Sequence, residues 1–101
     1  MKTETFFYID FNYALSEQIT TRLTANVQLQ HSLPHYLITN FHLEDDPNGS
    51  PLLPDIDIVA IKDEKGIRWV HLDSRKETVL STAIGKSIEA RGDVEFVNSG
   101  R

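Results

Sequence analysis

The sequence predicts an α+β domain, a two-layer sandwich with two helices on one face of a mixed or antiparallel sheet of four to five strands. Three observations support this prediction. Several segments rich in β-branched and aromatic residues have the composition of strands, two segments carry apolar residues at helical spacing, and clusters of turn residues separate them. The predicted element order is β-α-β-β-β-α-β, a variant of the ferredoxin-like arrangement.

The chain has the size of one ordinary domain. It contains 101 residues, of which 40% are hydrophobic and 25% are charged, and this balance is typical of a globular protein with one core. We therefore expect a single domain over residues 1–101, with residues 97–101 forming a loose tail.

The first predicted strand covers residues 4–11, which are mostly β-branched or aromatic. Phe6 and Tyr8 point to one face, and Phe7, Ile9 and Phe11 point to the other. Because both faces are apolar, we expect a strand that is covered on both sides and lies centrally in its sheet.

The first predicted helix covers residues 14–28. Leu15, Ile19, Leu23 and Val27 recur at intervals of four residues and stay within one broad helical face. Threonines in this segment lower its helix propensity, and its last residues alternate between apolar and polar. The last residues of this segment could therefore be extended instead of helical.

The middle of the chain predicts a second strand followed by a long loop. Pro34 ends the preceding element, and residues 35–44 have strand composition. Residues 45–54 contain three prolines and an Asn-Gly pair, and they begin with acidic residues. This composition is typical of a long surface loop.

Residues 55–62 and 67–73 predict a β-hairpin, which is the strongest local signal in the chain. Gly66 lies in the connecting turn, where a left-handed backbone conformation is often needed. Within this hairpin, Trp69 and His71 are expected to share one face.

The second predicted helix follows the hairpin. Ser74 and Glu77 have the spacing of a capping box, and Gly92 has the position of a C-terminal stop. Gly85 lies inside this helix, where glycine is unfavourable, and it suggests a close backbone approach. Residues 93–97 predict a short last strand.

Composition excludes several classes of protein. The chain has 10 basic and 15 acidic residues, a net charge of −5, and its scattered basic residues make nucleic-acid binding unfavourable. It has no cysteine, so disulfides and thiolate metal sites are ruled out. No apolar stretch approaches the ~20 residues of a membrane span, and we expect a cytoplasmic protein without a cofactor or metal.

The first functional hypothesis concerns the sheet. Strand 4–11 is apolar on both faces, and the two predicted helices can cover only one face of the sheet. An apolar open face is normally buried by a partner, by a second copy or by a ligand. We therefore expect a small, non-catalytic protein-interaction module that self-associates through its sheet, as a two-fold symmetric dimer.

A second hypothesis is a small-molecule-binding domain or a simple acid–base enzyme, with its pocket over the open sheet face. The candidate ligand-binding residues are Tyr8, Asp10, Trp69 and His71. This hypothesis requires a hollow in which His71 and a carboxylate converge within hydrogen-bond reach.

A third hypothesis is an acidic inhibitor or immunity-type protein that binds a basic partner. The candidate partner-binding residues are Glu44, Asp45, Asp46, Asp55 and Asp57. Complementary charge accelerates and orients such binding, so its strength would depend on salt concentration.

Overall fold

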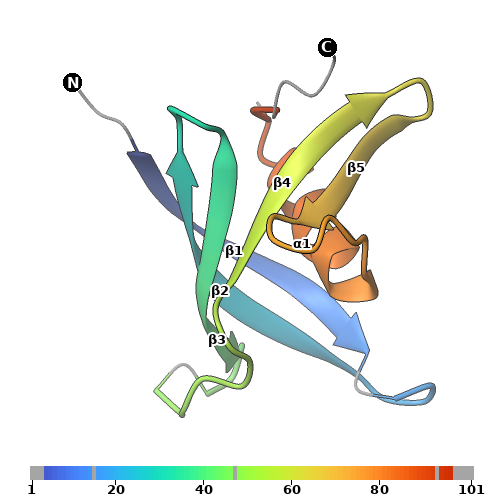
Figure 1. Ribbon diagram of the computed structural model, residues 1–101. Coiled ribbons are helices and arrows are strands. Elements are labelled where there is room, and N and C mark those ends of the chain that lie inside the picture. Colours follow the sequence, from blue (N-terminus) through green and yellow to red (C-terminus); the bar gives the residue numbers. More distant parts are fainter. Residues whose placement is uncertain (1–3, 15, 47, 93, 97–101) are drawn as a thin grey trace.

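The protein folds as a curled antiparallel sheet closed by one helix (Figure 1). The computed structural model describes residues 4–14, 16–46, 48–92 and 94–96. The elements are β1 (Glu4–Ala14), β2 (Thr20–Gln30), β3 (His35–Leu43), β4 (Ile56–Asp63), β5 (Gly66–His71) and α1 (Val79–Glu89). The strands pair in chain order, so β1 and β5 form the two edges of the sheet.

Helix α1 covers the concave side of the sheet and contacts both edge strands, β1 and β5 (Figure 1). It therefore bridges the open side of the curl. Within the described ranges, no helix is long and apolar enough to cross a membrane.

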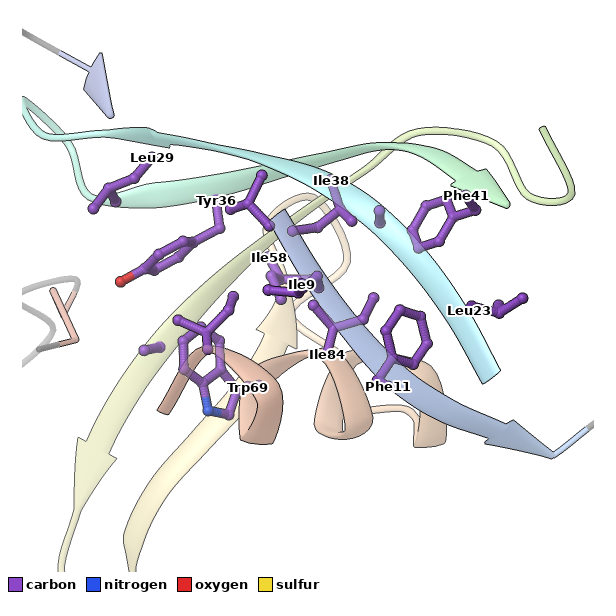
Figure 2. Packing of buried hydrophobic residues seen from close by; sticks show 14 residues of the cluster. Ile9, Phe11, Leu23, Leu29, Tyr36, Ile38, Phe41, Ile58, Trp69 and Ile84 are labelled. Carbon is purple, nitrogen blue, oxygen red and sulfur yellow. The ribbon is translucent and has the colours of Figure 1, made fainter. Parts of the chain in front are cut away.

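The core fills the space between the curled sheet and α1 (Figure 2). Aromatic side chains from different strands interlock there: Phe11 lies edge-on to Phe41 at 6.2 Å, and Tyr36 lies edge-on to Trp69 at 5.3 Å between ring centroids. Pairs in this arrangement contribute about 0.5–1.5 kcal/mol beyond their buried area. The helix contributes Ile84 to the same core.

The predicted two-helix sandwich is wrong, because the described part of residues 14–28 contains no helix, and Leu15 lies outside the described residues. Most of this segment belongs to β2, which pairs with β1 on one side and β3 on the other. A four-residue interval is also a multiple of two, so Leu23 and Val27 lie on one face of a strand as well. Ala25 and Leu29 are buried on that same face, which completes a period of two.

The predicted central position of the first strand is also wrong, because β1 is an edge strand. The predicted division of its faces holds: Ile9 and Phe11 are buried, whereas Phe6 and Tyr8 are exposed. Both faces of β1 are therefore apolar in sequence, although only one face is covered by other parts of the protein.

The strand over residues 35–44 and the hairpin over 55–62 and 67–73 are confirmed as β3, β4 and β5. Gly66 in the hairpin turn has a φ of 120°, a conformation that side chains with a Cβ rarely adopt. The second helix is confirmed as α1, but its predicted cap is wrong by one turn. The capping box is formed by Thr78 and Ser81.

The C-terminal segment fills a gap in the sheet. Strands β3 and β4 pair only from Tyr36↔Ile58 to Ile38↔Ile56, and beyond this point Ala60 bridges Phe96 in parallel. The predicted strand over 93–97 is thus a single bridge, and residues 93 and 97 lie outside the described residues. The Tyr36 hydroxyl accepts a hydrogen bond from the Glu95 backbone N–H at 3.0 Å, which ties this segment to β3.

Burial raises the pKa of the Tyr36 phenol, and the Glu95 carboxylate adds to this effect, although the Glu95 N–H opposes it. In the unfolded chain the phenol ionises near pH 10. Above that pH the unfolded state loses a proton that the folded state retains, so stability falls as pH rises through the folded pKa. We expect urea denaturation between pH 9 and pH 11 to show this loss, with a slope of at most about 1.4 kcal/mol per pH unit from this group.

Tyr36→Phe removes the ionisable group and should flatten this part of the profile. Tyr8→Phe is the matched control, because Tyr8 is 75% exposed and should leave the profile unchanged. An unaltered slope in Tyr36→Phe would show that alkaline destabilisation arises elsewhere.

Candidate interaction surface

The outer face of β1 carries two large exposed side chains. Phe6 is 67% and Tyr8 is 75% exposed, and they lie opposite Gln28 and Asn26 of β2. Together with Thr39 of β3, these four side chains line a hollow of about 400 Å³. The hollow therefore lies on the convex face of the sheet, away from α1 and the core.

The edge of β1 also presents backbone groups. The Ser87 hydroxyl donates to the Asp10 carbonyl at 3.0 Å, so this carbonyl points away from β2. In an antiparallel pair, both backbone groups of a residue face the same side, and the side alternates from residue to residue. The N–H and C=O groups of Glu4, Phe6 and Tyr8 therefore also point outward. Among the outward backbone groups of Glu4, Phe6, Tyr8 and Asp10, only the Asp10 carbonyl has a hydrogen-bond partner in the part of the chain that the structure describes.

The opposite edge, on β5, is partly occupied by the chain itself. The Ser81 hydroxyl donates to the Trp69 carbonyl at 2.8 Å. The His71 N–H donates to the Lys76 carbonyl at 2.9 Å, and the His71 carbonyl accepts from the Arg75 N–H at 2.9 Å. The two edges of the sheet therefore differ: on β5 the Trp69 carbonyl and both His71 groups are hydrogen-bonded within the chain, whereas on the described part of β1 the Asp10 carbonyl is the only outward group with such a partner.

Strand β1 lacks three of the features that prevent edge-to-edge pairing, namely lysine, proline and a bulge. Residues 4–14 contain neither lysine nor proline, and their pairing with β2 runs without a shift from Glu4↔Gln30 to Ala14↔Thr20. The edge is regular enough to accept another strand.

The acidic groups on β1 are already engaged. The Glu4 carboxylate accepts hydrogen bonds from the side-chain amides of Gln28 at 2.6 Å and Gln30 at 3.2 Å. The Asp10 carboxylate pairs with Arg22 at 2.6 Å. These contacts reduce the repulsion that an approaching acidic protein would meet at this edge.

The structure brings together two of the four predicted ligand-binding residues. Tyr8 and Asp10 line a hollow of about 690 Å³ beside the end of α1, together with Ser87 and Arg91. Trp69 is only 1% exposed and is a core residue, with its indole N–H donating to Glu89 at 2.7 Å.

His71, the fourth candidate, lies at the end of β5. Its Nε2 is hydrogen-bonded to the Thr78 hydroxyl at 3.0 Å. It lines a separate hollow of about 190 Å³ with Asp55 and Asp57. The acid–base hypothesis requires a carboxylate within hydrogen-bond reach of His71, and the hydrogen bond found in the described part of the chain goes to a hydroxyl instead.

The predicted partner-binding residues fall into two groups. Glu44, Asp45 and Asp46 are exposed after β3, and Glu44 faces Arg22 at 3.8 Å. Asp55 and Asp57 lie at the start of β4, where Asp57 faces His35 at 3.7 Å. Binding of a basic partner by these residues stays a prediction.

Comparisons with known proteins identified no match. The chain matches none of the family models, curated proteins or solved structures with which it was compared. Among the described residues, no group of three or more His, Asp or Glu side chains is placed to hold a metal ion.

Sequence reasoning did not place Phe6 or Ser87 among the candidate site residues. Phe6 has the composition signal of a buried strand, and its exposure arises because the convex face of the sheet is uncovered at β1. Ser87 approaches Asp10 from 77 residues away, and no local pattern indicates this contact.

Proposed function

We propose that this protein is a non-catalytic interaction module that self-associates in the cytoplasm by pairing the β1 edges of two copies. The observation that carries the proposal is the difference between the two edges of the sheet. On β5 the Trp69 carbonyl and both His71 groups are occupied, whereas the outward groups of Phe6 and Tyr8 on β1 have no hydrogen-bond partner among the described residues. Pairing of two such edges satisfies the backbone of both and creates a closed two-fold dimer.

The exposed aromatic rings add to this pairing. Cross-strand aromatic pairs contribute about 0.2–1 kcal/mol each, and removal of their apolar surface from water contributes more. The small area expected for such an edge favours a dimer that exchanges with monomer rather than a permanent one.

We expect the wild type to show reversible dimerisation in sedimentation velocity between about 5 and 500 µM, a range suited to weak dimers. Phe6→Lys and Tyr8→Lys should raise the dissociation constant by about tenfold or more, a loss of ~1.4 kcal/mol. The physical reason is that lysine removes the apolar contact of an aromatic ring, and in Phe6→Lys it also brings the like charges of two copies together.

Leu33→Lys is the matched control. Leu33 is 76% exposed, and it lies in the turn between β2 and β3 rather than on the β1 edge. The dimer dissociation constant of Leu33→Lys should therefore equal that of the wild type. A wild type that stays monomeric throughout this range, or equal weakening in all three variants, would overturn the proposal.

A further inference from the structure

The open edge of β1 is short, and its limits restrict how two copies can pair. Its outward residues are Glu4, Phe6 and Tyr8. The next outward residue is Asp10, and its carbonyl is already bound by Ser87 of α1. A partner strand therefore finds unoccupied backbone groups only on the first half of the described strand.

We infer that two copies pair their β1 strands antiparallel, with a two-fold axis at Phe6. This inference rests on the proposed function. In this register, Phe6 faces the partner's Phe6, and Glu4 faces the partner's Tyr8. The three facing pairs exchange both of their backbone hydrogen bonds, about six bonds in all.

The two registers that are shifted toward Asp10 are chemically poorer. An axis at Phe7 places Glu4 opposite the partner's Asp10, and like charges in facing positions are destabilising. An axis at Tyr8 places Phe6 opposite the partner's Asp10. Both registers need the Asp10 carbonyl, which Ser87 occupies, whereas the register centred on Phe6 does not.

The side chains of the favoured register are also complementary. The two Phe6 rings, 67% exposed in one copy, meet on the outer face and bury each other. The Tyr8 hydroxyl can donate to the partner's Glu4 carboxylate, which otherwise accepts from Gln28 and Gln30. The segment from Glu4 to Tyr8 is therefore self-complementary, and this property favours a second copy over an unrelated strand.

The register also separates the two helices. Helix α1 approaches β1 at Asp10, beyond the paired segment. With the axis at Phe6, the Asp10 of each copy lies past the Glu4 of the other. Each α1 therefore stays clear of the region where the strands meet.

Cysteine cross-linking tests the register directly, because the natural chain has no cysteine. Facing residues of a hydrogen-bonded antiparallel pair have Cα atoms about 5.5 Å apart, within the range that a disulfide spans. In a glutathione redox buffer, Phe6→Cys should form a covalent homodimer at least about tenfold faster than Tyr8→Cys, because a disulfide cannot span positions four residues out of register. A mixture of Glu4→Cys and Tyr8→Cys should form the mixed dimer.

Leu33→Cys measures the rate of random collision, because Leu33 is equally exposed and lies outside the edge. The fluorescence of the single tryptophan verifies that each variant is folded. The rates are compared at a protein concentration at which sedimentation shows the Phe6→Cys and Tyr8→Cys variants to be dimeric. If Tyr8→Cys then cross-links faster than Phe6→Cys, or if both match Leu33→Cys, the register is wrong and the proposed function stands. If the wild type shows no concentration-dependent dimer, the proposed function itself fails.

Discussion

Replacing Gly85 with alanine is expected to lower the free energy of unfolding by about 3 kcal/mol or more, the upper range for an overpacked core. A Cβ atom at this position would lie 2.0 Å from Cγ and 2.2 Å from Cδ1 of Trp69, so the helix or the indole must move. The indole has little room, because its ring packs against Tyr36 and its N–H is bonded to Glu89. The ~1 kcal/mol that alanine gains in helix propensity does not offset this clash.

Thermal and urea denaturation followed by Trp69 fluorescence measure this effect, because Trp69 is the only tryptophan in the chain. A loss of about 3 kcal/mol corresponds to a decrease in Tm of roughly 12–24 °C for a domain of this size. Lys86→Ala is the matched control, because the adjacent Lys86 is exposed and its loss should change stability by less than about 0.5 kcal/mol. Equal stabilities of the two variants would contradict the packing of Gly85 against Trp69.

Ser81→Ala is expected to lower the free energy of unfolding by about 2–3 kcal/mol, because it leaves buried polar groups without partners. Ser81 is fully buried, and its hydroxyl accepts from the Thr78 N–H at 2.9 Å and donates to the Trp69 carbonyl at 2.8 Å. One side chain thus completes the capping box of α1 and closes the edge of β5. The substitution removes both functions at once.

Thr82→Ala is the matched control for this prediction. The Thr82 hydroxyl makes only a long contact of 3.5 Å with Glu77, so its removal should change stability by less than about 0.5 kcal/mol. Urea denaturation gives both values, and amide hydrogen exchange should show faster exchange at the start of α1 in Ser81→Ala alone. A Ser81→Ala variant as stable as Thr82→Ala would mean that water replaces the lost hydroxyl.

Local signals located the elements whose partners are close in the sequence. The β4–β5 hairpin follows from two alternating segments around Gly66, and both strands pair through a short turn. Helix α1 follows from its apolar stripe, although Thr78 rather than Ser74 caps it. Several hydroxyl and acidic residues near this start satisfy the capping pattern, and only packing against β5 selects one of them.

The error at β2 has a definite physical cause. Apolar residues at intervals of four fit one face of a helix and one face of a strand equally well. Pairing with β1 and β3, together with the burial of Ala25 and Leu29, selects the strand. Propensity over a short window does not detect such pairing between strands.

The sequence likewise predicted one part of the candidate interaction surface and not the rest. Alternation places Phe6 and Tyr8 on one face and Ile9 on the other, and the structure retains this division. Whether that face is covered depends on the side of the sheet against which α1 packs. The hydrogen bonds of Ser87 and Ser81, which reach β1 and β5 from the helix, decide which carbonyl groups at the edges are occupied.

By itself, the sequence determined a cysteine-free acidic chain, strand β3, the β4–β5 hairpin, helix α1 and the alternation of faces along β1. These features arise from side-chain chemistry and from contacts between residues near one another in the chain. Only the tertiary structure decided that residues 20–30 form a strand, that β1 lies at an edge and that α1 binds the Trp69 carbonyl on one edge and the Asp10 carbonyl on the other. Each of these outcomes is set by hydrogen bonds to backbone groups, and backbone groups are the same in every residue except proline, so side-chain patterns do not reveal them.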